Sequence, residues 1–412
     1  MIRRLSIATV IASLSLANGP GLLGDDEPPA DRDLSTKELK RAGPFLLQPV
    51  IVLKDVGYDD NVRFDTANPE GSTTATAGMG LNSLLLTGDR GGLRMYQEVD
   101  YTAFGSENEL NYWNLLSRAR GIFLMKKALL SLENDYSYTR QRPNTEIDQR
   151  VRLRDNIVEA TAKSLTTGRL GGRGFLKYEK LDYGSDELDL DIYQERLNRT
   201  EKSVGAAAEF RVLPKTTFIA EAIISDIDFD DDTEGRDSDV DTMLFGLEFD
   251  PSASLQGRLM IGSTDLVAPA RPQNNIREPV GEAELSTRLG SRSRGRGTFE
   301  RNLVFSIFQE NLYYIGTYWT AAYEYFFSRR ISGELMYGEG TNEYPLEVVR
   351  GGPDPFQGLR TDDFTRYQVA VRYRVSDLAA LEVKWYRLDR DSTDDFWDRS
   401  RNFYGFGYTY EF

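Results

Sequence analysis

The chain contains no cysteine and no histidine, and these two absences exclude whole classes of chemistry. Without cysteine there is no disulfide framework, no lipid-modified cysteine and no thiolate metal site. Without histidine, the Ser-His and Asp-His arrangements of many hydrolases are unavailable. The 50 basic residues are outnumbered by 65 acidic ones, which argues against a nucleic-acid partner, because phosphate binding needs clustered Lys and Arg.

Long apolar runs are scarce as well. Beyond the N-terminal segment no run approaches the roughly 20 apolar residues that a membrane-spanning helix needs, so a helical membrane protein is excluded. The N-terminal segment has Arg3 and Arg4, a mostly apolar run over 5–16 and a small residue at Ala17, which predicts a Sec-type signal peptide over 1–17. Residues 18–43 are rich in Pro, Asp, Glu and Lys, and we expect them to form a disordered periplasmic leader.

What the chain does contain is β-strand alternation, most clearly in its last nine residues. Large rings occupy every second position, at Tyr404, Phe406, Tyr408, Tyr410 and Phe412, and small or polar residues lie between them. This period of two indicates a strand with one apolar face. A terminal strand that ends on Phe resembles the C-terminal signal that the insertion machinery of outer-membrane proteins reads. Tyr408, Tyr410 and Phe412 are therefore the predicted assembly signal.

Short turns recur with a spacing of roughly forty residues, which suits a hairpin of two membrane-crossing strands and one loop. These turns are predicted near Gly88, Lys127, Gly168, Pro214, Pro251, Gly290, Arg329 and Asp377. Longer polar stretches lie between them, at 59–71, 140–149, 182–189, 226–239, 269–277, 338–361 and 389–398. Over 44–412 the pattern predicts an all-β protein: a single transmembrane antiparallel up-and-down β-barrel of about eighteen strands, with about sixteen as the alternative, in the outer membrane of a Gram-negative bacterium.

Alternation within the strands assigns a lipid face and a lumen face. In 364–375, Tyr367, Val369 and Val371 share one face, and Arg366 and Arg372 lie on the other. A soluble β-sandwich would show the same alternation, but the signal peptide and the terminal Phe favour a barrel with a wet lumen. The predicted lumen-lining residues are Glu248, Glu282, Glu284, Arg288, Glu334, Arg366, Arg372, Arg374 and Lys384.

Candidate chemical sites in the sequence are weak. Glu282 and Glu284 form a carboxylate pair of the kind used by glycosidases, but lumen-facing charge explains them more simply. The acidic stretch 226–239 lacks the ligand spacing of a calcium loop, and whether it binds a cation stays open. We expect no catalytic residues, no metal site and no cofactor.

The longest predicted loop, 338–361, is unusually apolar. It contains Tyr344, Leu346, Val348 and Phe356, which need a surface to cover. Two arrangements remain open: the loop folds inward or across the mouth as a constriction, or it packs over neighbouring loops outside the pore.

The stretch Tyr58-Asp59-Asp60-Asn61-Val62 follows the first predicted strand. It resembles a stretch in the outer-membrane β-barrel porins that are often found with exopolysaccharide secretion genes. The resemblance implies a non-enzymatic barrel that serves as an exit for polysaccharide. Its partners would be outer-membrane lipid, the barrel insertion machinery, polysaccharide and periplasmic export proteins. The alternatives are a general or substrate-selective diffusion porin, and a structural or adhesive barrel with an occluded lumen.

Overall fold

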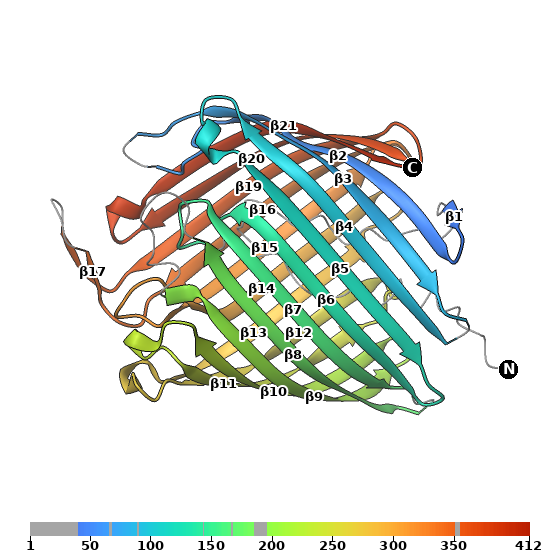
Figure 1. Ribbon diagram of the computed structural model, residues 1–412, viewed down its shortest axis with the longest axis horizontal. Helices are drawn as coiled ribbons and strands as arrows, with labels where there is room; N and C mark the ends of the chain where they lie inside the picture. The colour runs from blue at the N-terminus through green and yellow to red at the C-terminus, as the bar shows by residue number, and fades with distance from the viewer. Residues whose placement is uncertain are drawn as a thin grey trace.

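The computed structural model describes residues 40–65, 68–88, 90–142, 144–165, 168–184, 196–350 and 355–412. The predicted signal peptide, most of the predicted leader and part of the loop predicted at 182–189 lie outside these residues. Most of the described chain forms one antiparallel sheet that closes on itself (Figure 1). No helix in this part of the chain is both long enough and apolar enough to cross a bilayer.

Each strand of the barrel pairs with the next one along the chain, and β2 pairs with both β3 and the last strand, β21. The sheet has 19 strands; without the short β1 the closed barrel has eighteen, as predicted. The barrel strands are β2 (Phe45–Asp59), β3 (Ser72–Leu86), β4 (Gly91–Phe104), β5 (Tyr112–Leu124), β6 (Ala128–Gln141), β7 (Val151–Ser164), β8 (Leu170–Gly184), β9 (Arg199–Leu213), β10 (Thr216–Phe229), β11 (Ser238–Phe249), β12 (Leu255–Val267), β13 (Ile276–Arg288), β14 (Ser293–Phe305), β15 (Tyr313–Phe326), β16 (Ile331–Glu343), β19 (Thr361–Arg374), β20 (Ala379–Ser392) and β21 (Arg399–Glu411).

Short elements decorate the two ends of the barrel. They are the strands β1 (Lys40–Ala42), β17 (Val348–Arg350) and β18 (Phe356–Gly358) and the 3₁₀ turns η1 (Asn108–Leu110), η2 (Asp232–Glu234), η3 (Pro272–Asn274) and η4 (Asp395–Trp397). The strand β1 corrects the predicted boundary of the leader at residue 43. Gly43 adopts a φ of 64°, which lets Lys40–Ala42 fold back and pair with β2.

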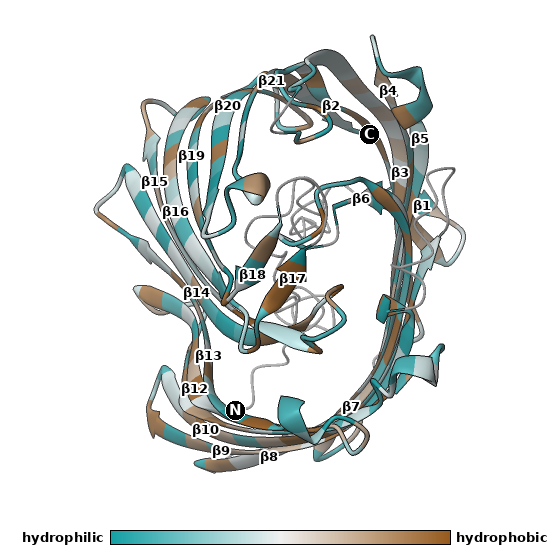
Figure 2. Cartoon of the chain, turned by 90° about the vertical axis from the view of Figure 1, so that its left-hand side faces the viewer, coloured by the Kyte–Doolittle hydropathy of each residue, from teal (hydrophilic) through white to brown (hydrophobic). Residues whose placement is uncertain are grey.

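All eight predicted short turns connect strands at one end of the barrel, which we call the turn end. The longer connections lie at the opposite end, the loop end, which faces the viewer in Figure 2. Two of these loops were not predicted, the β4–β5 loop at 105–111 and the β14–β15 loop at 306–312.

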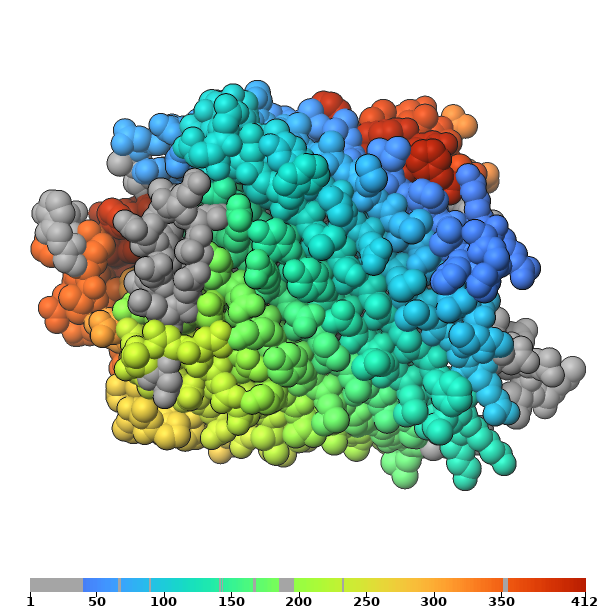
Figure 3. Space-filling view, viewed as in Figure 1, coloured from blue at the N-terminus to red at the C-terminus, as the bar shows by residue number. Residues whose placement is uncertain are grey.

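The outer wall is apolar and the inner wall is polar, as the alternation predicts. On β19, the outward-facing Val369 and Val371 are 39% and 47% exposed, whereas Arg366, which faces the interior, is 8% exposed. Figure 3 shows part of the outer wall, where consecutive strands cross the surface as oblique stripes. An exposed apolar wall around a polar interior is the arrangement of a barrel in lipid.

Candidate functional site: the lumen and the hairpin that enters it

Ion pairs cover the inner wall, and four of the predicted lining residues take part in them. Arg372 Nη2 lies 2.5 Å from Glu382, and Lys384 Nζ lies 2.7 Å from Asp55. The other pairs are Glu334 with Arg296, and Glu282 with Arg258 at 3.4 Å. Opposite charges on neighbouring strands offset one another, so these pairs do not form a ring of a single sign.

The remaining predicted lining residues share the inner face with these pairs. Glu248 and Glu284 lie directly opposite Arg258 on the two strands that flank it. Arg366 donates to Gln368 at 3.0 Å and lies over the Tyr386 ring. The two others are Arg288, which is opposite Arg294, and Arg374, which is opposite Ala380.

A β-bulge in β2 turns two consecutive charged residues toward the lumen. The pairing of β2 shifts between Lys54 and Gly57, and Asp55 adopts a φ of 54°. An Asp tolerates this left-handed conformation better than most residues. As a result Lys54 reaches Asp100 at 2.9 Å and Asp55 reaches Lys384 on the other side of the strand. The bulge therefore links β2 to β4 and to β20 through ion pairs on the lumen side.

The loop end of the β14–β15 hairpin leaves the wall and enters the lumen. Nearer the turn end, Trp319 and Tyr323 of β15 point outward, as do the residues opposite them on β14. Phe305 lies an even number of residues farther along β14, so the alternation would point it outward as well. Yet the Phe305 ring packs edge-on against Phe229 of β10 at 5.2 Å, and Arg199 of β9 lies over it at 4.8 Å. Because Phe229 and Arg199 belong to the inner wall, the hairpin end must lie inside the barrel. We call residues 302–315 the plug hairpin.

The inward bend buries both faces of the plug hairpin. One face joins a large apolar cluster with inner-wall residues of β7, β8, β10 and β12. Its most buried members are Ile147, Leu197, Leu266, Ala268, Leu312 and Tyr313, none more than 1% exposed. The other face, through Val304 and Tyr314, packs on Tyr344 and Val348. The plug hairpin therefore connects residues of β7, β8, β10 and β12 with Tyr344 and Val348 near the loop end.

Three arginines hold the tip of the plug hairpin, residues 306–312, from the neighbouring loops. Arg196 donates to the Ile307 carbonyl at 2.6 Å, Arg236 to the Ser306 carbonyl at 2.5 Å, and Arg271 to the Gln309 carbonyl at 2.5 Å. All three guanidinium groups lie within 3.6 Å of the Glu234 carboxylate. Burial, together with the two neighbouring arginines, lowers the pKa of Arg236 to about 10 although Glu234 opposes this. The tip is thus fixed through its backbone.

A second loop crosses the lumen from the other side. The β6–β7 loop, 142–150, reaches Tyr318 on β15 through the Thr145 hydroxyl at 3.0 Å, and Arg390 on β20 through the Asp148 carboxylate at 2.8 Å. These strands lie on the far side of the ring of strands from β6 and β7. We call this segment the strut loop.

Glu146 at the centre of the strut loop joins it to the plug hairpin. Its carboxylate is fully buried and accepts from the Ser306 hydroxyl at 2.6 Å and from the Ile307 amide at 2.8 Å. Burial raises the pKa of Glu146, although these hydrogen bonds and the nearby Arg360 act in the opposite direction. Burial therefore favours the protonated form of Glu146 in this docked position.

The match to a family model identifies the group of proteins to which this barrel belongs. A model described as "Putative beta-barrel porin 2" matches residues 40–412. The chain belongs to this porin family. It is a β-barrel of the Gram-negative outer membrane.

Several solved structures are similar to this porin over most of its length. The outer-membrane protein OpdK from Pseudomonas aeruginosa is 11% identical, with a TM-score of 0.47 over 89% of this chain and 98% of that one. OccK3 (OpdO) from the same species is 14% identical, with a TM-score of 0.47 over 89% and 95%. The ferric enterobactin receptor PfeA, also from that species, is 9% identical, with a TM-score of 0.44 over 89% and 80%. No curated protein matches the sequence.

The apolar loop predicted as a constriction begins at Tyr344 in the porin, because β16 continues to Glu343. Tyr344 and Val348 are buried against the plug hairpin, and Phe356 packs beside them. Leu346 exchanges two backbone hydrogen bonds with the Asn311 side chain, at 2.9 and 3.0 Å. The loop therefore covers the face of the plug hairpin opposite the large apolar cluster, and its strands β17 and β18 appear over the middle of the opening in Figure 2.

The plug hairpin, the strut loop and the three arginines were not among the predicted site residues. One signal for the hairpin is present in the sequence: 303–305 and 312–315 are apolar at consecutive positions. A strand between lipid and a wet lumen alternates, whereas an unbroken apolar run indicates burial on both faces. Ile307 and Phe308 extend this signal into the loop.

The acidic stretch predicted at 226–239 is partly paired. Asp228 lies 2.5 Å from Lys202, and Asp230 lies 2.6 Å from Lys180. Within the described residues, no group of three or more acidic side chains is placed to hold a metal ion.

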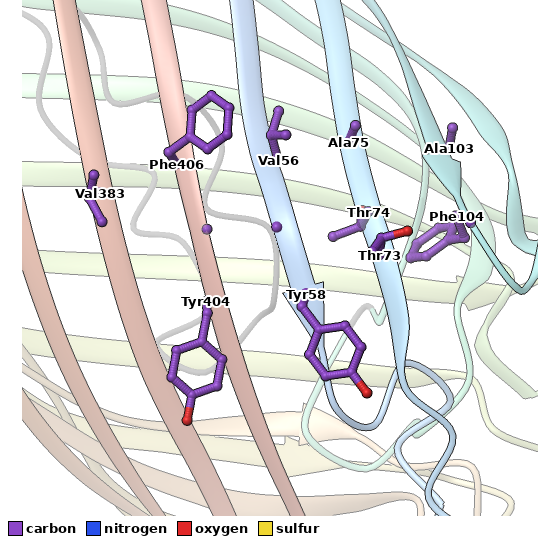
Figure 4. Close-up of a pocket in the computed structure, with 13 residues that line it drawn as sticks. Val56, Tyr58, Thr73, Thr74, Ala75, Ala103, Phe104, Val383, Tyr404 and Phe406 are labelled. Atoms are coloured by element: carbon purple, nitrogen blue, oxygen red, sulfur yellow. The ribbon is translucent and has the colours of Figure 1, made fainter.

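The predicted assembly signal lies along the seam where the barrel closes. Tyr408 lies between Leu381 and Leu53, and Tyr410 between Ala379 and Ile51. Phe412 stacks edge-on with Tyr410 at 4.6 Å, and its amide donates to Pro49 at 2.9 Å. Farther along the seam, the outer wall has an apolar depression of about 870 Å³ over β20, β21, β2, β3 and β4 (Figure 4).

Deleting Phe412 is expected to lower the amount of folded porin in the outer membrane several-fold. The deletion removes the last hydrogen bond of the seam and the exposed ring that the insertion machinery is expected to read. Heat-modifiable gel migration and the abundance of the folded band measure the effect. Phe412→Tyr, which keeps a ring and the amide, serves as the matched control. Wild-type abundance after the deletion would remove Phe412 from the assembly signal.

Glu146→Gln is expected to abolish a pH dependence of the pore. In the docked state the pKa of Glu146 is raised, so docking takes up a proton. The docked contact is fully present below the ordinary Glu pKa of about 4.3 and weakens as the pH rises through the raised value. Openings in single-channel recordings should therefore become more frequent as the pH rises in the wild type, but not in Glu146→Gln, which mimics the neutral acid. An identical pH profile for both proteins would contradict this role.

Proposed function

We propose that the porin is a non-enzymatic, normally closed channel through which polysaccharide leaves the cell. The observation that carries the proposal is that the lining of the lumen changes along the barrel axis, from charged to apolar. Near the turn end the inner wall is lined by offset ion pairs, and near the loop end two crossing segments meet in apolar contacts. A barrel of about eighteen strands is wide enough for an aqueous channel, so these segments would retain periplasmic contents between export events.

The mixed charge of the wall suits a polar substrate that carries no strong charge of either sign. A chain of sugars presents hydroxyl groups along its whole length, and carboxylates and guanidinium groups both bind hydroxyls. The resemblance of the Tyr58–Val62 stretch to porins found with exopolysaccharide secretion genes supports this substrate class. Periplasmic export proteins would meet the turn end, and outer-membrane lipid would cover the apolar wall.

The test compares a strain that lacks this porin with two others. One carries the wild type, and the other carries a folded variant whose plug hairpin is cross-linked in the closed position. Loss of surface polysaccharide with unchanged uptake of small solutes is the expected result. Unchanged polysaccharide with impaired solute uptake would assign the channel to diffusion instead.

The packed loop end also favours a second function, that of a structural or adhesive barrel whose lumen never opens. Planar-bilayer recordings separate the two, because an occluded barrel shows no conductance steps at any voltage. A channel should show rare openings of large amplitude.

A further inference from the structure

The wall of the barrel is interrupted beside the plug hairpin. Pairing between β13 and β14 stops at Gly281 and Arg301. Beyond this rung, residues 276–280 of β13 still pair with β12, and residues 302–305 of β14 still pair with β15. The two segments thus have facing edges that do not pair with each other. Unpaired strand edges inside a closed barrel are unusual, because closure normally satisfies every edge.

Pro279 explains why the pairing ends at this place. The Pro279 carbonyl points toward β14, since Arg301 Nε donates to it at 3.1 Å. The N–H and C=O groups of a strand residue point to the same side, so the nitrogen of Pro279 also faces β14, where it has no hydrogen to donate. In the same register the next hydrogen-bonded rung, Pro279 with Leu303, would therefore lose one of its two hydrogen bonds.

Arg301 stands at the point where the two strands separate. Besides Pro279, it contacts Glu278 at 3.2 Å and the Thr317 hydroxyl at 2.6 Å. Its side chain thus spans β13, β14 and β15 and occupies the hydrogen-bonding position that a paired strand would take. This arrangement supplies a pivot with partners on both sides.

We propose that the plug hairpin is a gate that swings about Arg301 between the lumen and the wall. In the closed position it packs inside the barrel, held by Arg196, Arg236, Arg271 and Glu146. In the open position the β14 strand of the plug hairpin completes the wall by pairing with residues 278–280 of β13. Continuing the observed register places Val280 opposite Asn302, Pro279 opposite Leu303 and Glu278 opposite Val304.

The two positions are alternative arrangements of the same groups. Opening exchanges apolar contacts and arginine bonds for new rungs of the sheet and exposes the polar inner wall. The missing N–H of Pro279 weakens the wall position, and the Nε atom of buried Arg236, which has no hydrogen-bond partner in the described residues, weakens the closed one. An element with two packed positions of similar stability is what a gate requires.

Engineered disulfides test the gate directly, because the chain has no cysteine of its own. Glu278→Cys with Val304→Cys forms a non-hydrogen-bonded pair in the open register, a geometry that suits a disulfide. Glu146→Cys with Ser306→Cys places two thiols at the closed contact, where a short, reducible bis-methanethiosulfonate linker can span the length lost from the Glu146 side chain. The open lock should form slowly and hold the conductance at its maximum, and the closed lock should form readily and abolish openings. A reductant should restore wild-type behaviour in both cases.

Single-cysteine variants control for the substitutions, and heat-modifiable migration confirms that each barrel is folded. Pro279→Val provides a test without cross-linking, since it restores the N–H and should lengthen the open time several-fold. The gate is overturned if the oxidised Glu278→Cys/Val304→Cys barrel conducts as the wild type, if that pair never oxidises in a folded barrel, or if Pro279→Val leaves the open time unchanged. These outcomes do not depend on which molecule the channel carries.

Discussion

Replacing Ile307–Asn311 by two glycines is expected to raise the conductance of the purified porin by about an order of magnitude, because an unobstructed barrel of about eighteen strands holds an aqueous channel. The change removes the backbone carbonyls that accept from Arg196 and Arg271, and it removes the apolar side chains that seat the tip. Cells that express it should become sensitive to antibiotics too large for ordinary diffusion. Single-channel recordings and growth inhibition measure the two effects.

Two further variants make this result specific. Gln309→Ala/Glu310→Ala removes only exposed side chains and keeps the carbonyls bound by Arg271 and Asn274, so it should conduct as the wild type. Deleting 347–357, the core of the predicted constriction loop, should give a smaller rise, because the three arginines that hold the tip of the plug hairpin keep their contacts. Unchanged conductance in a folded barrel with the shortened tip would show that the hairpin does not limit the pore.

The parts of the fold that follow from local rules could be predicted from the sequence. Turn residues such as Gly88, Pro214 and Asp377 mark hairpins, and their spacing yields the strand number because both depend only on the length of a membrane crossing. The lipid and lumen faces follow from the side-chain period of two. Val371 and Arg372 are therefore assigned to opposite faces with no knowledge of their neighbours.

The segments inside the lumen depend on contacts between residues that are far apart in the chain. Glu146 meets Ser306 only because the barrel closes and places β6 and β7 opposite β15. No local pattern specifies which loops face each other across a closed ring. The bulge at Asp55 is similar: two adjacent charges break the alternation, but their direction depends on Lys384 and Asp100 on the adjoining strands.

The Tyr58–Val62 stretch supplied a family resemblance, and its physical role is to close the barrel. Asp59 binds Arg401, Asp60 accepts from the Asn402 amide and side chain, and the Asn61 side chain donates to the Ser400 carbonyl. All three contacts join the first barrel strand and its loop to the last strand. Behind them, Gly57 lies opposite Gly405, where a Cβ on Gly57 would come within 1.9 Å of the Tyr404 carbonyl. The stretch therefore holds the first and last barrel strands together at the seam.

Arg401→Met is expected to destabilise the folded barrel by about 3–5 kcal/mol, the usual cost of breaking a buried ion pair. Arg401 and Asp59 are 3% and 1% exposed, and their closest N–O distance is 2.6 Å. The substitution leaves the Asp59 carboxylate buried without its cation, at the seam that closes the sheet. Urea titration in detergent micelles, followed by gel migration of the folded band, measures the loss.

A double-mutant cycle separates the ion pair from the packing of the Arg401 side chain. Asp59→Asn/Arg401→Met leaves no buried charge, so it should lose less than the sum of the two single variants. Arg372→Met is the matched control, because Arg372 and Glu382 pair across neighbouring strands but are 60% and 32% exposed. Solvent screens that pair, and its loss should cost about 0–1 kcal/mol. Equal losses for Arg401→Met and Arg372→Met would show that the seam is held by its backbone ladder and not by the buried charges.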